Sequence, residues 1–228
     1  MISEYSKVGS YHSTQGLPNQ DSVSSASNER YKAIVLADGV STCPKAQTGA
    51  EIVSGTTALY LQKKAQILFD LNERAISARI LDQVLELLEQ QANKDAANVK
   101  DYSCTLSAAL LDTQKQKLLC FNLGDGLILG SDGKQCYIYA HPASSSEGCS
   151  TVTTEFAAQE AETKVFDCSG MKQVYILSDG AWRLMTERNR LNPTIQTFLI
   201  NGNIEKLKDY LDHASNVDDS SFISMKLQ

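Results

Sequence analysis

Residues 33–41, with the sequence AIVLADGVS, decide the fold. An apolar run typical of a buried strand ends in the carboxylate of Asp38, and Gly39 follows directly. Residues 174–182, VYILSDGAW, repeat this arrangement with Asp179. A carboxylate at the end of a core strand is costly to desolvate unless a cation or a metal ion neutralises it. Few lysines or arginines lie near these segments in the sequence, so the pattern favours a metal.

Further acidic residues stand at comparable positions. Asp125 ends the apolar run CFNLGD, and Asp21 lies in a loop that leads into the first core strand. Asp218 and Asp219 immediately precede the last predicted strand. Several carboxylates at sheet ends would suit hard divalent ions, which prefer oxygen ligands. Asp132, by contrast, lies among polar residues and precedes a glycine, which predicts only a hairpin turn.

Composition narrows the class of protein. Of the 228 residues, 42% are hydrophobic and 21% are charged, as in ordinary soluble domains. The net charge of −6 and the absence of a basic cluster argue against nucleic acid and anionic membranes as partners. No signal peptide and no apolar run of about 18 residues is present, so we predict a cytoplasmic protein. Six cysteines without a C-x-x-C pair indicate reduced thiols rather than a zinc site.

The order of predicted elements indicates an α+β fold. Strands and helices do not alternate, which argues against a doubly wound parallel sheet and favours antiparallel sheets with helices packed outside. We expect one domain over residues 1–228. The predicted strands are 2–11 (weak), 31–39, 172–180 and 220–227, the hairpins are 104–112 with 117–126 and 127–140, the helices are 46–66, 71–93, 181–186 and 204–213, and the loops are 13–22 and 141–163, the latter a loop or mobile insertion.

An ordered set of short motifs resembles the protein phosphatase 2C family of metal-dependent serine/threonine phosphatases. The set is NQD, VLADG, SCT, NLGDG, ILSDG and DDSSFISMKL, and the resemblance runs from about Gly9 to the C-terminus. The segment GSYHSTQGLPNQD is similar to a branch common in bacteria. The family's fold is a four-layer αββα sandwich, two antiparallel sheets between pairs of helices, which agrees with the α+β prediction.

The resemblance also implies a centre of two Mn²⁺ or Mg²⁺ ions and a possible third, weaker one. A hydroxide held by metals about 3.5–4 Å apart would attack phosphorus directly, without a phosphoenzyme. From the residues alone, either Asp218 or Asp219 could be the ligand. Only the family's last motif favours Asp218. The implied ligands are Asp38 bridging both metals, the Gly39 carbonyl on one, Asp179 and Asp218 on the other, Asp21 through metal-bound water, and Asp125 on the third ion.

Three positions depart from the better-known members. Gly16 stands in place of a phosphate-binding arginine, Gln20 in place of a glutamate, and Val40 in place of a histidine proposed as general acid. We therefore expect His12 to contact phosphate or to protonate the leaving group, with Lys45 as the rival cation and a merely hydrogen-bonded histidine as the alternative.

The expected partner is a phosphorylated protein, together with a serine/threonine kinase that would modify it. Two other functions stay open from the sequence. One is a pseudophosphatase, a regulatory module with weak or no turnover, and the other is a hydrolase of small phosphate esters.

Overall fold

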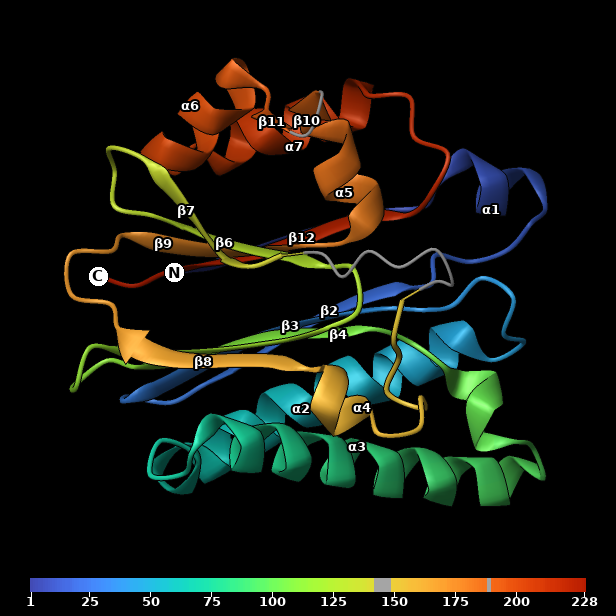
Figure 1. Ribbon diagram of the computed structural model, residues 1–228. Coiled ribbons are helices and arrows are strands. Elements are labelled where there is room, and N and C mark those ends of the chain that lie inside the picture. Colours follow the sequence, from blue (N-terminus) through green and yellow to red (C-terminus); the bar gives the residue numbers. More distant parts are fainter. Residues whose placement is uncertain (142–148, 188–189) are drawn as a thin grey trace.

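The computed structural model describes residues 1–141, 149–187 and 190–228. Two five-stranded antiparallel sheets are stacked face to face, and helices cover the outer face of each (Figure 1). The predicted α+β sandwich of antiparallel sheets and flanking helices is confirmed. We call the sheet with strand order β1-β12-β9-β6-β7 the first sheet and the sheet with order β2-β3-β4-β5-β8 the second sheet.

The strands of both sheets come from the whole length of the chain. The first sheet pairs the two ends of the chain, because β1 and β12 are neighbours. Its strands are β1 (Ile2–Lys7), β6 (Leu127–Ser131), β7 (Cys136–Ala140), β9 (Gln173–Leu177) and β12 (Ser220–Lys226). The strands of the second sheet are β2 (Asp21–Ser27), β3 (Tyr31–Asp38), β4 (Leu106–Asp112), β5 (Lys117–Leu123) and β8 (Glu162–Asp167).

Two long helices cover the outer face of the second sheet. They are α2 (Ala46–Leu68) and α3 (Glu73–Asp95), and the Asn72 side chain caps α3 by accepting a hydrogen bond from the Ala75 amide. Helix α2 packs on β2, β3 and β4, and α3 packs on α2 and β8. The predicted apolar stripe of α3, through Ile80 and Val84, is buried in the same core cluster. The short elements η1 (Val99–Tyr102) and α4 (Ala157–Glu160) complete this layer.

Three helices cover the outer face of the first sheet (Figure 1). They are α5 (Asp179–Leu184), α6 (Pro193–Asn201) and α7 (Ile204–His213). Tyr175 of β9 is fully buried beneath them and donates a hydrogen bond to the Leu199 carbonyl. A small hairpin of β10 (Thr186–Glu187) and β11 (Arg190–Leu191) follows α5.

The alternation of side chains along β3 aims Asp38 into the space between the sheets. Ala33, Val35 and Ala37 pack with the helices of the second sheet, whereas Ile34 and Leu36 pack against the first sheet. Because side chains in a strand alternate between the two faces, Asp38 continues the row of Ile34 and Leu36. The shared interior draws on both halves of the chain, which supports a single domain over residues 1–228; that extent stays a prediction.

Several local predictions need correction. The first strand ends at Lys7, and residues 10–14 form the short helix α1 (Ser10–Thr14) instead of continuing it. Strand β2 and helix α6 form where we predicted no regular element. The predicted loop 141–163 contains α4 and the start of β8; its residues 142–148 lie outside the described part of the chain.

Other predictions are confirmed. Both hairpins form, with β4 paired to β5 and β6 paired to β7, and Asp132 lies in the turn of the second. All six cysteines are free. Within the described ranges, no helix combines the length and the apolar character that a membrane crossing requires.

Candidate metal centre

Four aspartates from distant parts of the sequence line one hollow of about 170 Å³. Asp38 ends β3, Asp125 lies between β5 and β6, Asp179 begins α5, and Asp218 precedes β12. The structure thus brings together the strand-end carboxylates that the sequence singled out. The other lining residues are Gly39, Val40, Ser41, Thr105 and Cys149.

A fifth carboxylate, Asp21, lies directly opposite Asp38 in the β2–β3 pair. Residues opposite each other on antiparallel strands project from the same face, so the two carboxylates share one local environment. Neither carboxylate oxygen of Asp21 has a hydrogen-bond partner, although both are buried. The pKa of Asp21 is raised to about 7, mainly by burial and also by the carboxylates of Asp219 and Asp179, whereas the nearby hydroxyls of Ser221 and Ser178 lower it.

Burial and neighbouring carboxylates also disfavour the ionised form of Asp38. Its side chain keeps some exposure to the hollow, but the surrounding protein withdraws it from bulk water. This desolvation raises its pKa well above the usual value, and the charges of Asp21, Asp179, Asp125 and Asp218 add to the shift. A positive charge placed among these groups would remove the cause of both shifts.

Arg183, which was not predicted from the sequence, contacts two of the aspartates that line the hollow. It lies one helical turn after Asp179 on α5, and its Nη1 atom is 2.6 Å from Asp179 Oδ2. Its Nη2 atom is 3.9 Å from Asp125 Oδ2. The expectation that few basic residues pair with these carboxylates is therefore wrong at this position. The i, i+4 spacing of Asp179 and Arg183 was the available signal.

The neighbouring Trp182 ties α5 to the Asp125 loop. Its indole Nε1 donates a hydrogen bond of 2.8 Å to the Asp125 carbonyl oxygen. Desolvation raises the pKa of Asp179 to about 6, with Asp125 and Asp218 raising it and Arg183 lowering it. One arginine thus offsets only part of the repulsion among the carboxylates.

The donor set fits hard divalent ions. Oxygen ligands, orphaned buried carboxylate atoms at Asp21 and mutual repulsion at Asp38 are the features that such an ion would satisfy. Among the described residues, no group of three or more His, Cys, Asp or Glu side chains is arranged to hold an ion as it stands. Arg183 already engages Asp179, so loading the site requires that these side chains rearrange.

The glycines of the two Asp-Gly motifs permit close backbone packing around the hollow. A Cβ atom on Gly180 would lie 2.0 Å from the carbonyl oxygen of Asp219. A Cβ atom on Gly39 would lie 2.9 Å from the Cβ of Ala46, at the start of α2. Each glycine therefore allows a distant segment to approach the aspartate before it, which explains why both strand ends carry the pair.

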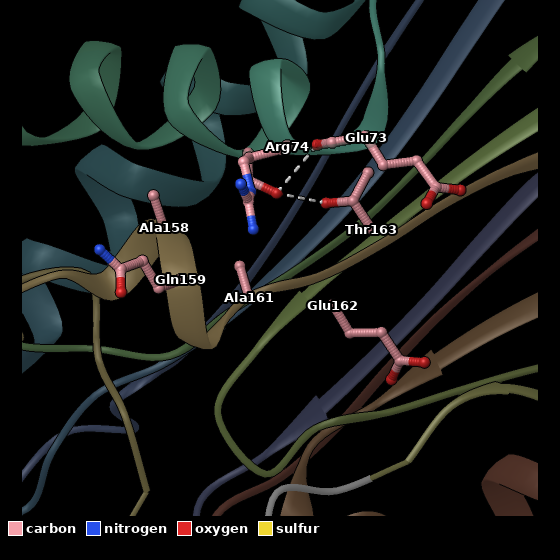
Figure 2. A pocket seen from close by; sticks show the side chains of 8 residues that line it. Glu73, Arg74, Ala158, Gln159, Ala161, Glu162 and Thr163 are labelled. Carbon is pink, nitrogen blue, oxygen red and sulfur yellow. Dashed lines mark hydrogen bonds between the residues drawn. The ribbon is translucent and has the colours of Figure 1, made fainter.

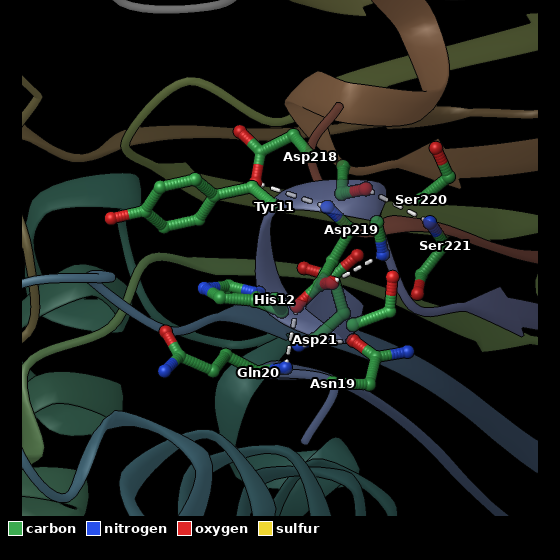
Figure 3. A network of polar contacts seen from close by, with 12 residues as sticks. Tyr11, His12, Asn19, Gln20, Asp21, Asp218, Asp219, Ser220 and Ser221 are labelled. Carbon is green, nitrogen blue, oxygen red and sulfur yellow. Dashed lines mark hydrogen bonds and ion pairs between the residues drawn. The ribbon is translucent and has the colours of Figure 1, made fainter. Parts of the chain in front are cut away.

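Asp218 and Asp219 are neighbours in sequence but have different environments (Figure 3). Asp218 lines the hollow, whereas Asp219 is 3% exposed and accepts three hydrogen bonds or ion-pair contacts. Its partners are the Gly9 amide at 2.8 Å, the Gln20 amide at 2.6 Å and His12 Nδ1 at 2.9 Å. This arrangement supports Asp218 as the ligand and gives Asp219 a structural role.

His12 lies in α1 and is only 2% exposed. It is not among the residues that line the hollow, and its Nε2 atom is buried without a hydrogen-bond partner. The rival cation Lys45 forms an ion pair with Asp95 at 3.1 Å. Gly16, at the position of the family's arginine, begins the turn after α1 with a φ of +68°. Val40 does line the hollow, where it offers no proton.

A larger hollow of about 730 Å³ lies between α3, α4 and β8 (Figure 2). Its side chains include Glu73, Arg74, Gln159 and Glu162, and Ser77 shares a 2.8 Å hydrogen bond with Thr163 at its wall. None of the predicted site residues lines it. The choice of the candidate site therefore rests on the convergence of carboxylates and not on volume.

Comparison with protein families decides the relationship. The family model described as Protein phosphatase 2C matches residues 8–214, which is most of the chain. The chain belongs to the protein phosphatase 2C family. The prediction from the ordered motifs is thereby confirmed, and these motifs occupy the strand ends described above. Comparison with curated protein sequences finds no match.

Solved structures share the protein phosphatase 2C fold at low sequence identity. The serine/threonine phosphatase Stp1 from Staphylococcus aureus has a TM-score of 0.70 and 16% identity, over 100% of this chain and 94% of that one. A bacterial serine phosphatase has a TM-score of 0.64 and 12% identity, over 100% and 97%. RsbX, crystallised with magnesium, has a TM-score of 0.62 and 12% identity, over 100% and 94%.

Proposed function

We propose that this member of the protein phosphatase 2C family is an active enzyme that hydrolyses phosphoserine and phosphothreonine in proteins, with two Mn²⁺ or Mg²⁺ ions and a weaker third. The observation that carries the proposal is the convergence of Asp38, Asp125, Asp179 and Asp218 on one hollow, with the unpartnered carboxylate of Asp21 beside it. A cytoplasmic location and a serine/threonine kinase that phosphorylates the substrate belong to the same proposal.

The proposed ligands follow the positions of these side chains. Asp38 would serve both main ions, and the Gly39 carbonyl one of them. Asp179 and Asp218 would hold the other, Asp21 would act through an intervening water, and Asp125 would hold the third. When bound, the ions would activate water as the nucleophile and neutralise charge on the phosphoryl oxygens.

The chain holds Asp38 rigidly from both sides. The Gly39 amide donates to the Gln20 carbonyl at 3.1 Å, from the β2 side. On the β4 side, the Thr105 amide donates to the Asp38 carbonyl at 2.8 Å, and the Thr105 hydroxyl accepts from the Asp38 amide at 3.2 Å. These bonds fix the backbone from which the Asp38 carboxylate projects, and a site on a rigid element is more precisely positioned than one on a loop.

His12 contributes to the proposal as a positioning residue. Its hydrogen bond to Asp219 joins α1 to the segment that presents Asp218. Asp219 also accepts from the Gln20 amide, one residue before Asp21. His12 thus lies behind two proposed ligands, and its role as a proton donor stays a prediction.

Two alternatives compete with this proposal. Gly16 and Val40 remove two groups that help better-known members, and Arg183 engages Asp179, which together favour a pseudophosphatase as the main rival. The other rival is a hydrolase of small phosphate esters, since the residues around the hollow do not identify a protein as the substrate.

A metal-dependent assay separates the three functions. We expect hydrolysis of p-nitrophenyl phosphate and of a phosphoserine or phosphothreonine peptide when Mn²⁺ or Mg²⁺ is added, and almost none after exhaustive chelation. Chelation should leave the circular dichroism spectrum unchanged, because the apolar core is independent of the ions. Asp38→Ala, the control, should lose at least a hundredfold in rate while keeping its fold.

The outcomes are distinct for each function. Absence of turnover on both substrates with any of the added ions would support a pseudophosphatase. Turnover of small esters without turnover of phosphopeptides would support the small-molecule hydrolase. Full activity after chelation, or in Asp38→Ala, would contradict the metal mechanism itself.

A further inference from the structure

Arg183 is the basic residue that the described structure places on the candidate metal ligands. Its guanidinium contacts Asp179 Oδ2 at 2.6 Å and approaches Asp125 Oδ2 at 3.9 Å. Among the described residues, no other ion pair involves the aspartates that line the hollow. The five carboxylates of the cluster are therefore neutralised only in part, and from one side.

The guanidinium and a divalent ion would compete for the same oxygen atoms. An ion coordinated by Asp179 needs the carboxylate lone pairs that Arg183 now occupies, and two cations close to each other repel. Arg183 is 55% exposed, so its side chain has room to withdraw from Asp179. Metal binding would therefore release a mobile guanidinium at the edge of the hollow.

A guanidinium at this edge is suited to a phosphate group. Its planar fork can donate two hydrogen bonds to phosphoryl oxygens, and charge-assisted bonds of this type are strong. The two basic groups expected near the site are unavailable for this task. Lys45 is paired with Asp95, and the ring of His12 is buried against Asp219.

The geometry points to Arg183 as a displaceable counter-ion, which holds Asp179 and Asp125 in the metal-free protein and binds the phosphate of the substrate after a metal ion takes those carboxylates. The second part of this proposal rests on the proposed phosphatase function. Arg183 would then supply the positive charge that Gly16 cannot.

Removing the charge should change the affinities for metal and phosphate in opposite directions. We expect Arg183→Met to bind Mg²⁺ about three- to tenfold more tightly in isothermal titration calorimetry, because a competing cation is gone. With Mg²⁺ saturating, we expect it to bind inorganic phosphate about tenfold more weakly or worse. Arg183→Lys keeps the charge but not the fork, so it should resemble the wild type for Mg²⁺ and be intermediate for phosphate.

Thermal unfolding provides a readout that is independent of turnover. Without its counter-ion, metal-free Arg183→Met should unfold at a lower temperature than the wild type, and added Mg²⁺ should raise its Tm by a larger amount. Arg79→Met is the matched control, since Arg79 is an exposed arginine on α3, in the outer helical layer of the second sheet. It should behave like the wild type in each measurement.

Either of two results would overturn the proposal: Mg²⁺ affinity that is unchanged or weaker in Arg183→Met, or phosphate affinity that is unchanged. Both measurements use binding, so they decide the role of Arg183 even if the wild type hydrolyses no ester. Failure of hydrolysis in the wild type would count against the proposed function alone. Arg183→Gln provides a second uncharged variant should the methionine variant fold poorly.

Discussion

The Asp219 region and the Asp21–Asp38 pair are two ways of burying carboxylates in neighbouring parts of the structure. Asp219 accepts hydrogen bonds from two backbone amides and contacts His12, so both of its carboxylate oxygens have partners inside the protein. Asp21 has no partner for either oxygen, and Asp38 is surrounded by further carboxylates. The contacts of Asp219 join the two ends of the chain, whereas Asp21 and Asp38 lie on the consecutive strands β2 and β3.

The difference shows how a structural acid can be distinguished from a functional one. A buried charge with a full set of partners stabilises the packing around it, and its loss should be felt in stability. A buried charge without partners destabilises the protein that carries it unless something else binds there. The fold tolerates this second arrangement at Asp21 and Asp38, which supports the proposal that cations bind at this pair.

The largest expected effect on stability belongs to Asp219. Asp219→Ala would leave the Gly9 and Gln20 amides and the His12 ring without an acceptor, and we expect it to lower the free energy of unfolding by about 3–5 kcal/mol. Asp38→Ala, measured in chelator by urea denaturation, is the matched variant and should be neutral or stabilising, because it relieves repulsion. Equal destabilisation by the two variants would break the comparison.

The next largest expected effect is the change in stability of the metal-free protein with pH. The pKa of Asp21 is raised to about 7 and that of Asp179 to about 6, so the folded protein binds more protons than the unfolded chain above pH 4. These groups therefore contribute stability at low pH that is lost as the pH rises towards 6 and 7, on the order of 4 kcal/mol between pH 5 and pH 8.

Chemical denaturation in chelator between pH 5 and pH 8 checks this slope. Saturating Mg²⁺ should flatten or reverse it, because a bound ion favours the ionised carboxylates. The Asp21→Asn variant lacks one of the titrating groups, so its stability should change less with pH than that of the wild type. A metal-free wild type that is more stable at pH 8 than at pH 5 would contradict the assignment.

A smaller effect, on activity, is expected at His12. We expect His12→Ala to slow hydrolysis about tenfold through the displacement of Asp219 and its neighbours, equally on a phosphopeptide and on p-nitrophenyl phosphate. Equal losses indicate positioning, since the leaving group of p-nitrophenyl phosphate needs no proton. A much larger loss on the phosphopeptide would instead support proton donation by His12.

The smallest effect is expected at Asp132. Its carboxylate accepts hydrogen bonds from the Lys134 and Gln135 amides in an exposed turn. Asp132→Ala should lower stability only slightly and leave the rate of hydrolysis close to that of the wild type. Asp179→Ala should lose nearly all activity in the same assay, and similar losses in both variants would show that the strand context does not separate the two acids.

Much of the candidate site could be predicted because its signals are local. An apolar strand that ends in Asp-Gly is visible at Asp38 and Asp179 without any knowledge of the fold. That these ends meet is a property of the topology, and the ordered family motifs supplied it. The partners of Asp219 could not be predicted, because the Gly9 and Gln20 amides come from segments about 200 residues away.

Strand β2 and helix α6 were not predicted, for different reasons. Strand β2 contains four serines in seven residues, and it is a strand because β3 pairs along its whole length rather than because of its own propensity. Helix α6 did carry local signals, since Asn192 caps it, Pro193 occupies its first turn and Gly202 ends it. These local signals are sufficient to predict α6 from the sequence.

The hydrogen bond from Trp182 to the Asp125 carbonyl also gives the protein a built-in optical probe. The chain contains a single tryptophan, so its fluorescence comes from one place, the junction of α5 with the Asp125 loop. Ions that settle among the carboxylates would alter the polarity around this indole, and paramagnetic Mn²⁺ would quench its emission where diamagnetic Mg²⁺ would not. The occupancy of the centre could thus be followed in real time, without a label and without a substrate.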